Sequence, residues 1–199
     1  MKNTESGKIF DVDGFFASVI NRDPNLRRIP EYDAVGEFKG IQAVTFDSIE
    51  YNGKKTKVFA YMAFPDGADE STPGIVLIHG GGGHAFLPWV KMWRDRGYSV
   101  IAPDTVGNMP IDINAGCTES NGDWARKLHG VFEEDGYIPS PDNDGMSTYN
   151  LDVDRRWLTH ITAHCILSFT ALAQSGYADK NKIGITGISW GGVAVSYYL

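Results

Sequence analysis

The stretch that most restricts how this chain can fold lies near its end, at Gly187-Ile188-Ser189-Trp190-Gly191-Gly192. A short β-prone run precedes it and an apolar segment follows it, so the pattern predicts a strand, a sharp turn and the start of a helix. Gly187 and Gly191 flank Ser189 because a β-carbon at either position would clash with neighbouring backbone in so tight a turn. The turn would hold the Ser189 hydroxyl at the strand end, where the Trp190 amide and the helix start point toward a developing oxyanion.

A second glycine-rich segment follows a continuous apolar run over 74–78, which is typical of a buried strand. It begins at His79, and its four consecutive glycines, 80–83, expose backbone amides and allow a ligand or a loop to approach closely. The alternative is a plain flexible turn. The segment lacks the Gly-Lys-Ser/Thr of a phosphate-binding loop and the spacing of a dinucleotide-binding fingerprint. Gly-x-Ser-x-Gly alone is a weak pattern, so the two segments must be taken together.

The rest of the pattern predicts an α/β protein. It indicates a helix near 10–20 and a surface arm, followed by a hairpin of strands 41–51 and 56–64 around Asn52-Gly53. After the glycine-rich segment 79–83 it indicates a helix over 86–96 and a strand over 98–102. A long excursion over 105–150 with a short helix near 124–132 precedes a long helix over 152–176 that Asp152 would cap. We expect a mostly parallel sheet with an N-terminal antiparallel hairpin and flanking helices. Residues 1–40 would form an N-terminal helix and arm, and residues 41–199 the main domain.

This order of elements, with His-Gly-Gly-Gly after one strand and Gly-Ile-Ser-Trp-Gly-Gly after another, resembles the α/β-hydrolase superfamily. Over residues 41–199 the chain is most similar to the acetyl xylan esterase, dienelactone hydrolase and prolyl-oligopeptidase-like group. The resemblance implies that Ser189 is the nucleophile of acyl transfer. It also implies that Gly81 or Gly82, with Trp190, donates backbone hydrogen bonds to the oxyanion, typically worth about 3 to 4 kcal/mol per donor. The implied substrates are small-acyl esters such as acetylated sugars, with a prolyl-oligopeptidase-like peptidase as the alternative.

The chain departs from this superfamily after the nucleophile, where the acid and the histidine of the triad are expected. Only ten residues follow Ser189, and none is Asp, Glu or His. A serine without a general base attacks esters poorly at neutral pH. We therefore expect an N-terminal part of a hydrolase, C-terminally incomplete, with the triad acid and base outside it and little activity alone. The alternative from a different class is a non-catalytic fragment.

All five histidines precede Ser189, and their expected roles differ. His79 would brace the glycine turn, and His84 or His129 would line the substrate pocket. His160 and His164 share a helical face at a metal-compatible spacing, but no adjoining acid completes a metal site, and their helix is expected to pack away from the Ser189 turn. No metal is therefore predicted. Asp104, after a strand-ending proline, is expected to cap a turn rather than to act in catalysis.

Composition narrows the function classes further. The chain has 25 acidic and 18 basic residues, a net charge of −7, and no basic cluster that could neutralise phosphates, which argues against nucleic-acid binding. No segment has the length of a signal-peptide core or a membrane span. Cys117 and Cys165 are too few for a disulfide framework and are read as reduced thiols. We expect a cytoplasmic protein that acts on a small-molecule ester without a cofactor, and that self-associates through an exposed sheet edge.

Overall fold

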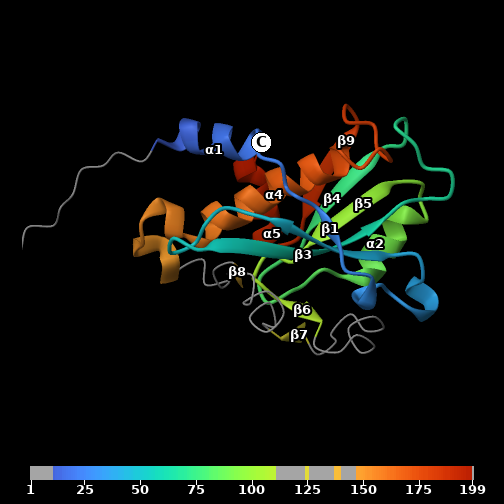
Figure 1. Cartoon of the computed structure of the whole chain (residues 1–199), viewed down its shortest axis with the longest axis horizontal. Helices are drawn as coiled ribbons and strands as arrows, with labels where there is room; N and C mark the ends of the chain where they lie inside the picture. The colour runs from blue at the N-terminus through green and yellow to red at the C-terminus, as the bar shows by residue number, and fades with distance from the viewer. Residues whose placement is uncertain (1–10, 111–123, 126–136, 140–146, 199) are drawn as a thin grey trace, which may run out of the picture.

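The structure is a computed structural model that describes residues 11–110, 124–125, 137–139 and 147–198. Its elements alternate between strands and helices in the way the sequence predicts (Figure 1). In chain order they are α1 (Val12–Ile20), β1 (Arg27–Arg28), η1 (Pro30–Tyr32), η2 (Gly36–Phe38), β2 (Gln42–Asp47), β3 (Lys55–Ala63), β4 (Gly74–Ile78), α2 (Leu87–Arg94), β5 (Ser99–Pro103), β6 (Met109–Pro110), β7 (Trp124–Ala125), β8 (Tyr137–Pro139), η4 (Ser147–Asn150), η5 (Val153–Arg155), α4 (Trp157–Ala173), β9 (Ile183–Gly187) and α5 (Trp190–Tyr198).

The main sheet has the strand order β1-β2-β3-β5-β4-β9, and β8 pairs with the start of β3. The ladders β5–β4 and β4–β9 are parallel, whereas β1–β2, β2–β3 and β3–β5 are antiparallel. This mixed sheet with flanking helices confirms the predicted α/β fold class. Among the described strands of this sheet the antiparallel and parallel ladders are equal in number, so the sheet is mixed rather than mostly parallel as predicted. Ile78 at the end of β4 pairs with Gly187 at the end of β9. The segments that follow these two parallel strands therefore leave the sheet side by side, at the carboxyl ends of the strands.

The N-terminal hairpin forms where Asn52-Gly53 predicts it. Asn52 has φ 53° and Gly53 has φ 71°, and the Tyr51 amide donates to the Lys54 carbonyl across the turn at 2.9 Å. Two successive positive φ angles match the twist of the flanking strands, which is why Asn-Gly is favoured here. Strands β2 and β3 then pair along the whole length of β2.

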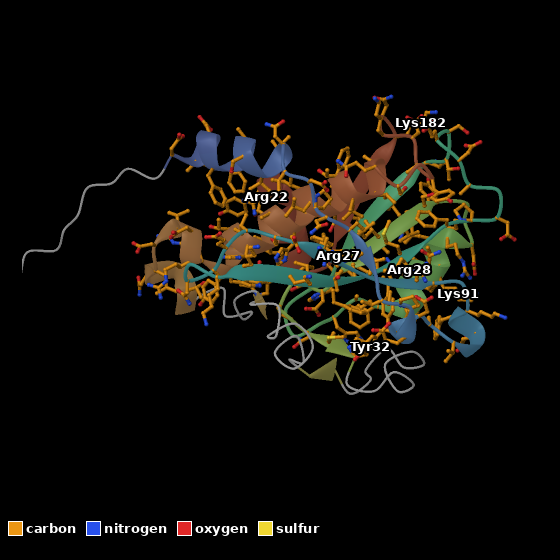
Figure 2. The ribbon with its side chains drawn as sticks, in the orientation of Figure 1. Arg22, Arg27, Arg28, Tyr32, Lys91 and Lys182 are labelled. Atoms are coloured by element: carbon orange, nitrogen blue, oxygen red, sulfur yellow. The ribbon has the colours of Figure 1, made fainter. Side chains whose placement is uncertain are left out.

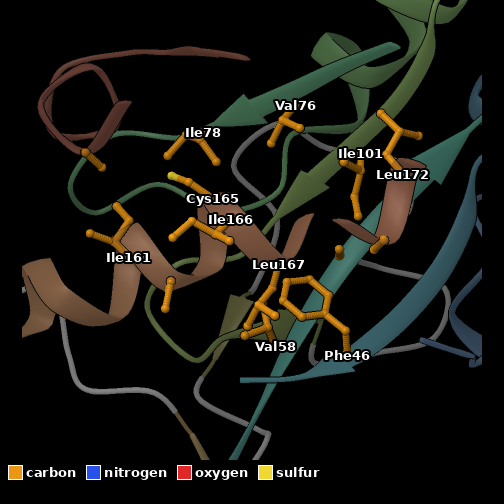
Figure 3. Packing of buried hydrophobic residues seen from close by; sticks show 14 of the residues in the cluster. Phe46, Val58, Val76, Ile78, Ile101, Ile161, Cys165, Ile166, Leu167 and Leu172 are labelled. Carbon is orange, nitrogen blue, oxygen red and sulfur yellow. The ribbon is translucent and has the colours of Figure 1, made fainter. Parts of the chain in front are cut away.

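Side chains of the central strands alternate between two hydrophobic cores, one on each face of the sheet. On β3, Val58, Ala60 and Met62 pack on the side of α1, α4 and α5, whereas the residues between them pack on the side of α2. Figure 3 shows the first core, where α4 lies across β4, β5 and β3 and inserts Ile161, Cys165 and Leu167 among the strand residues. The period-two alternation of a strand therefore gives both layers their apolar surface.

The two outer strands of the sheet differ in charge. β1 was predicted as part of a surface arm, but Arg27 and Arg28 pair with β2 and are exposed at that edge (Figure 2). Exposed charges of this kind discourage the pairing of an edge with another chain. At the other side, β9 pairs only with β4 within the described residues, and its sequence Ile-Gly-Ile-Thr-Gly carries no charge.

Two local predictions need correction. The long helix α4 begins at Trp157 with Arg156 as its N-cap, and Asp152 instead precedes the short turn η5 without a side-chain capping bond. The short helix predicted near 124–132 is wrong at its start, because residues 124–125 pair with β6 as strand β7; the remainder, 126–132, lies outside the described residues. The helix α4 itself is buried almost all round.

Candidate active site

Ser189 lies in the turn between β9 and α5, as predicted. Its φ is +53°, a conformation that non-glycine residues rarely adopt and that stores strain. The turn is tight, because the Gly191 amide donates to the Ile188 carbonyl at 2.8 Å and the Val193 amide to the Ser189 carbonyl at 3.1 Å. Ser189 itself is exposed. The expectation of a sharp strand-to-helix turn at Ser189 is confirmed.

The two flanking glycines are required by close backbone contacts. A β-carbon on Gly187 would overlap the carbonyl group of Gly191 and lie 2.7 Å from the Gly192 nitrogen. A β-carbon on Gly191 would overlap the Ile78 carbonyl and lie 2.6 Å from the His79 oxygen. All of these obstacles are backbone atoms, which cannot move aside as a flexible side chain can. The turn is therefore packed directly against the end of β4.

The glycine turn that follows β4 lies beside this serine turn. A β-carbon on Gly80 would lie 2.9 Å from the Ile188 oxygen and 3.1 Å from the Ser189 β-carbon. The glycine turn closes with the Gly83 amide donating to the Gly80 carbonyl at 3.1 Å, and Gly82 has φ +69°. The predicted proximity of the two turns is thus confirmed for Gly80.

The amides assigned to the oxyanion are available to a ligand. Within the part of the chain that the structure describes, the amides of Gly81, Gly82 and Trp190 donate no hydrogen bond to protein. Gly81 and Gly82 are exposed, and Trp190 is partly buried at the first position of α5. Unpaired amides beside an exposed serine are suited to receive developing negative charge. That the amides converge on one point stays a prediction.

Comparisons with known proteins support the fold. No family model matches the chain. The solved acetyl xylan esterase from Paenibacillus sp. R4 superposes with a TM-score of 0.59 at 16% identity, covering 98% of this chain and 57% of that one. The acetyl xylan esterase 1 from Thermoanaerobacterium sp. gives 0.57 at 14% identity, covering 93% and 52%. The chain has the α/β-hydrolase fold.

Among curated proteins, the dipeptidyl-peptidase 5 of Aspergillus oryzae is 34% identical over 80 residues, which is 36% of this chain and 11% of that protein. The probable dipeptidyl-peptidase 5 of Arthroderma benhamiae is 29% identical over 93 residues, 13% of that protein. The chain therefore spans roughly half the length of the solved esterases, and its matched residues cover only 11% and 13% of these curated relatives.

His79 braces the glycine turn of this α/β-hydrolase fold, as predicted. The Thr105 amide donates to His79 Nε2 at 2.9 Å, so Nε2 is an acceptor and the proton sits on Nδ1, which donates to the Gly80 carbonyl at 2.7 Å. Burial lowers the pKa of His79 to about 4. Asp104 Oδ2 lies 3.7 Å from Nε2, yet an ion pair would need a proton on the nitrogen that Thr105 already occupies. His79 is neutral at pH 7 and is no base for Ser189.

Asp104 caps the turn that carries Thr105. Its Oδ1 accepts the amides of Val106 at 3.0 Å and Asn108 at 2.7 Å. The carboxylate thereby satisfies two backbone donors that follow β5, which is the turn-capping role that the sequence favours over direct catalysis.

The other histidines that the structure describes are also buried. His84 is buried against the Phe86 ring, and burial lowers its pKa to about 4, so its role in lining a pocket stays a prediction. His160 and His164 are fully buried on α4. His160 Nε2 bonds the Asp154 carbonyl at 3.0 Å, and burial together with nearby His160 and His79 holds the pKa of His164 well below its ordinary value.

Two further questions concern metals and membranes. Among the described residues, no three His, Cys, Asp or Glu side chains gather closely enough to hold a metal ion. No helix among them combines the length and apolar character needed to cross a bilayer.

Cys165 is buried, and burial raises the pKa of its thiol to about 12. His129 and Cys117 lie outside the described residues.

Trp157 contacts the candidate site although no sequence pattern pointed to it, and its helix lies elsewhere than predicted. α4 was expected to lie away from the serine turn, but it packs against α5, and the Trp157 ring meets the Trp190 ring edge-on at 5.7 Å. The reason is topological. The connection β4–α2–β5 and the connection β5–α4–β9 run in opposite directions along the sheet, so right-handed crossovers place α2 and α4 on opposite faces. The strand order would have given this signal, but the strand order is not visible in the sequence.

Proposed function

We propose that this chain provides the nucleophile and the oxyanion-binding amides of a serine hydrolase that cleaves carboxylic esters through an acyl-enzyme on Ser189. The observation that carries the proposal is the exposed, strained Ser189 at φ +53°, set against Gly80 and next to amides without protein acceptors. The likeness to acetyl xylan esterase structures supports the fold, and the local sequence similarity to dipeptidyl-peptidase 5 supports acyl-transfer chemistry.

In this proposal the Ser189 oxygen attacks the carbonyl carbon of the ester, and the carbonyl oxygen becomes an oxyanion. Gly81 or Gly82 and Trp190 donate their amides to it, and the positive end of α5 adds a favourable field. The tetrahedral intermediate then expels the alcohol, which takes up the proton released by Ser189. Water attacks the acyl-enzyme in the same way and regenerates the serine.

The general base of this mechanism would come from polypeptide outside residues 1–199. Within the described residues Ser189 Oγ has no hydrogen-bonded side chain, and both ring nitrogens of His79 are engaged elsewhere. The ten residues after Ser189 contain no candidate. We propose that an acid and a histidine supplied in addition to these residues complete the triad, in the order that the α/β-hydrolase resemblance implies.

The favoured substrates are small-acyl esters, because acetyl xylan esterases superpose over nearly the whole chain. A peptidase is the second candidate, favoured by the 80-residue similarity to dipeptidyl-peptidase 5. The proposed roles of the two turns concern the acyl carbonyl, which esters and peptides share, and not the leaving group. They therefore serve either reaction equally well.

The test measures hydrolysis of p-nitrophenyl acetate, of longer p-nitrophenyl esters and of dipeptidyl p-nitroanilides. Four proteins are compared: the 199-residue chain and the longest form that the gene encodes, each with and without the Ser189→Ala substitution. Ser189-dependent turnover confined to a longer form supports the whole proposal. Robust Ser189-dependent turnover by the 199-residue chain would place the base within it and overturn the account of the triad. Turnover that ignores Ser189 would overturn the function.

A further inference from the structure

Trp157 is a fully buried side chain that contacts two parts of the candidate site. It is 1% exposed and opens α4. Its ring packs edge-on against Trp190, the residue that follows the proposed nucleophile. Its indole Nε1–H donates to the Thr105 carbonyl at 3.1 Å, in the segment after β5. One side chain therefore links the serine turn to the end of a different strand.

From Thr105 the contacts continue to the glycine turn. The Thr105 amide donates to His79 Nε2, and His79 Nδ1–H donates to the Gly80 carbonyl, at 2.9 and 2.7 Å. Thr105 and His79 are buried, so water does not compete for these bonds. Hydrogen bonds in such low-dielectric surroundings hold geometry more firmly than exposed ones.

These contacts lead back to the serine turn, because Gly80 lies against the Ile188 carbonyl and the Ser189 β-carbon. Trp190, Trp157, Thr105, His79 and Gly80 thus form a ring of contacts that begins and ends at the serine turn; we name it the bracing ring. A shift of any member must be absorbed by the others, because the interior is close-packed.

The bracing ring fixes the direction of the proposed oxyanion donors. None of the described peptide bonds is cis, so the carbonyl of Gly80 and the amide of Gly81, which share one peptide unit, point in opposite directions. The Gly80 carbonyl is held by His79 and by the Gly83 amide, so the Gly81 amide points away from both. At the other end, the Trp190 ring is held by Trp157, which limits rotation of the residue that carries the second donor.

We propose that Trp157 is a positioning residue for the oxyanion site: through the bracing ring it keeps the amide of the glycine turn and that of Trp190 in register. This inference rests on the proposed roles of Ser189 and of these amides. Trp157 itself touches neither substrate nor oxyanion. Its contribution should appear in kcat, because the interaction it aligns strengthens in the transition state.

The decisive variant is Trp157→Phe, which keeps an aromatic ring against Trp190 but removes the donor to Thr105. Trp93→Phe is the matched control. Trp93 packs edge-on against Tyr98 on the opposite side of the sheet, and its buried Nε1 has no hydrogen-bond partner among the described residues, so the same substitution breaks no such bond. His79→Asn is a second break in the ring, because asparagine can still donate near Gly80 but does not reach the Thr105 amide.

In the longest form of the protein, with p-nitrophenyl acetate, we expect Trp157→Phe to lower kcat about ten- to a hundredfold with KM changed less than about threefold. Trp93→Phe should leave kcat unchanged. The double variant Trp157→Phe/His79→Asn should be no slower than the slower single variant, because both break the same ring. Equal kcat for Trp157→Phe and Trp93→Phe, or independent, multiplying effects of the two ring variants, would overturn the inference.

A readout without catalysis separates this inference from the proposed function. In the 199-residue chain, hydrogen exchange of the Gly83 amide, which donates to the Gly80 carbonyl at 3.1 Å, should accelerate in Trp157→Phe and His79→Asn but not in Trp93→Phe. If the wild-type protein shows no Ser189-dependent turnover, the function fails while exchange still decides whether the ring exists. If Trp157→Phe unfolds the chain, His79→Asn gives the same test. Unchanged exchange of the Gly83 amide in His79→Asn would contradict the coupling.

Discussion

Two adjacent glycines at the start of α5 should respond in opposite directions to the same substitution. Alanine is the better helix former, by about 1 kcal/mol per residue in a helix interior. At Gly192 the nearest atom to a new β-carbon is the Gly187 oxygen at 3.4 Å, an ordinary contact. We therefore expect Gly192→Ala to raise the free energy of unfolding by about 0.5 to 1 kcal/mol.

At Gly191 the same helix preference is outweighed by contact with backbone. The β-carbon would overlap the Ile78 carbonyl and approach the His79 oxygen to 2.6 Å, so α5 or the end of β4 must move. Overpacking of this kind costs typically about 1 to 3 kcal/mol. The shift also threatens the bond from the Ile188 amide to the Ile78 carbonyl at 3.1 Å, a net contribution of about 1 kcal/mol. After the helix gain is deducted, Gly191→Ala should lower the free energy of unfolding by about 1 to 3 kcal/mol.

Urea unfolding followed by tryptophan fluorescence and by circular dichroism measures both variants against the wild type. An unchanged m value with a shifted midpoint identifies a change in stability alone. The expected separation between the two variants is about 2 to 4 kcal/mol, well above the error of such experiments. Equal midpoints for Gly191→Ala and Gly192→Ala would refute the close contact between the serine turn and β4.

Three other outcomes follow from the structure. Ser189→Gly should raise the free energy of unfolding by about 1 kcal/mol, because glycine relieves the strain at φ +53°, and it should abolish the proposed acyl transfer. A variant that is less stable in urea would contradict that strain. Acid should destabilise the fold, because burial lowers the pKa of His79 and of His160 from 6.5 to about 4. Between these values the unfolded chain binds more protons than the folded chain does. The free energy of unfolding should therefore fall from about pH 6.5 to pH 4, by up to about 3 kcal/mol per histidine. Urea midpoints that stay constant between pH 7.5 and pH 4.5 would show that these side chains are not buried neutral. Finally, we propose that the uncharged β9 edge causes self-association. Gly184→Lys should reduce this association, because Gly184 has open space for a side chain. Sedimentation velocity that shows the same concentration-dependent association for the wild type and for Gly184→Lys would reject this edge.

Local sequence patterns were sufficient for the elements whose signals are short-range. Asn52-Gly53 predicts its hairpin because the turn itself needs two positive φ angles. The apolar runs of β4 and β5 predict buried strands because both faces of each are covered. The glycines around Ser189 predict the sharp turn, because only a residue without a β-carbon fits the backbone contacts there. The identity of the site's central serine and of the glycine turn beside it could therefore be read from the chain.

Capping and helix faces were less secure, because the energies involved are small. Asp152 is a good N-cap by type, and such a cap is worth about 1 kcal/mol. The helix instead begins at Trp157, whose complete burial and indole hydrogen bond outweigh that preference. Burial of an aromatic side chain removes enough apolar surface from water to exceed a cap by a factor of two or more, at about 25 cal/mol per Å².

What the sequence determined by itself was the chemistry available at two turns, since turn geometry depends on the residues within the turn. Only the tertiary structure decided how those turns are joined. The strand order brings the ends of β4 and β9 together, and it places α4 against α5 rather than on the far face. The contacts among Trp157, Thr105 and His79 join residues far apart in the chain, and no periodicity records them. Their pairing follows from crossover handedness and close packing, which act on the whole sheet and not on any single segment.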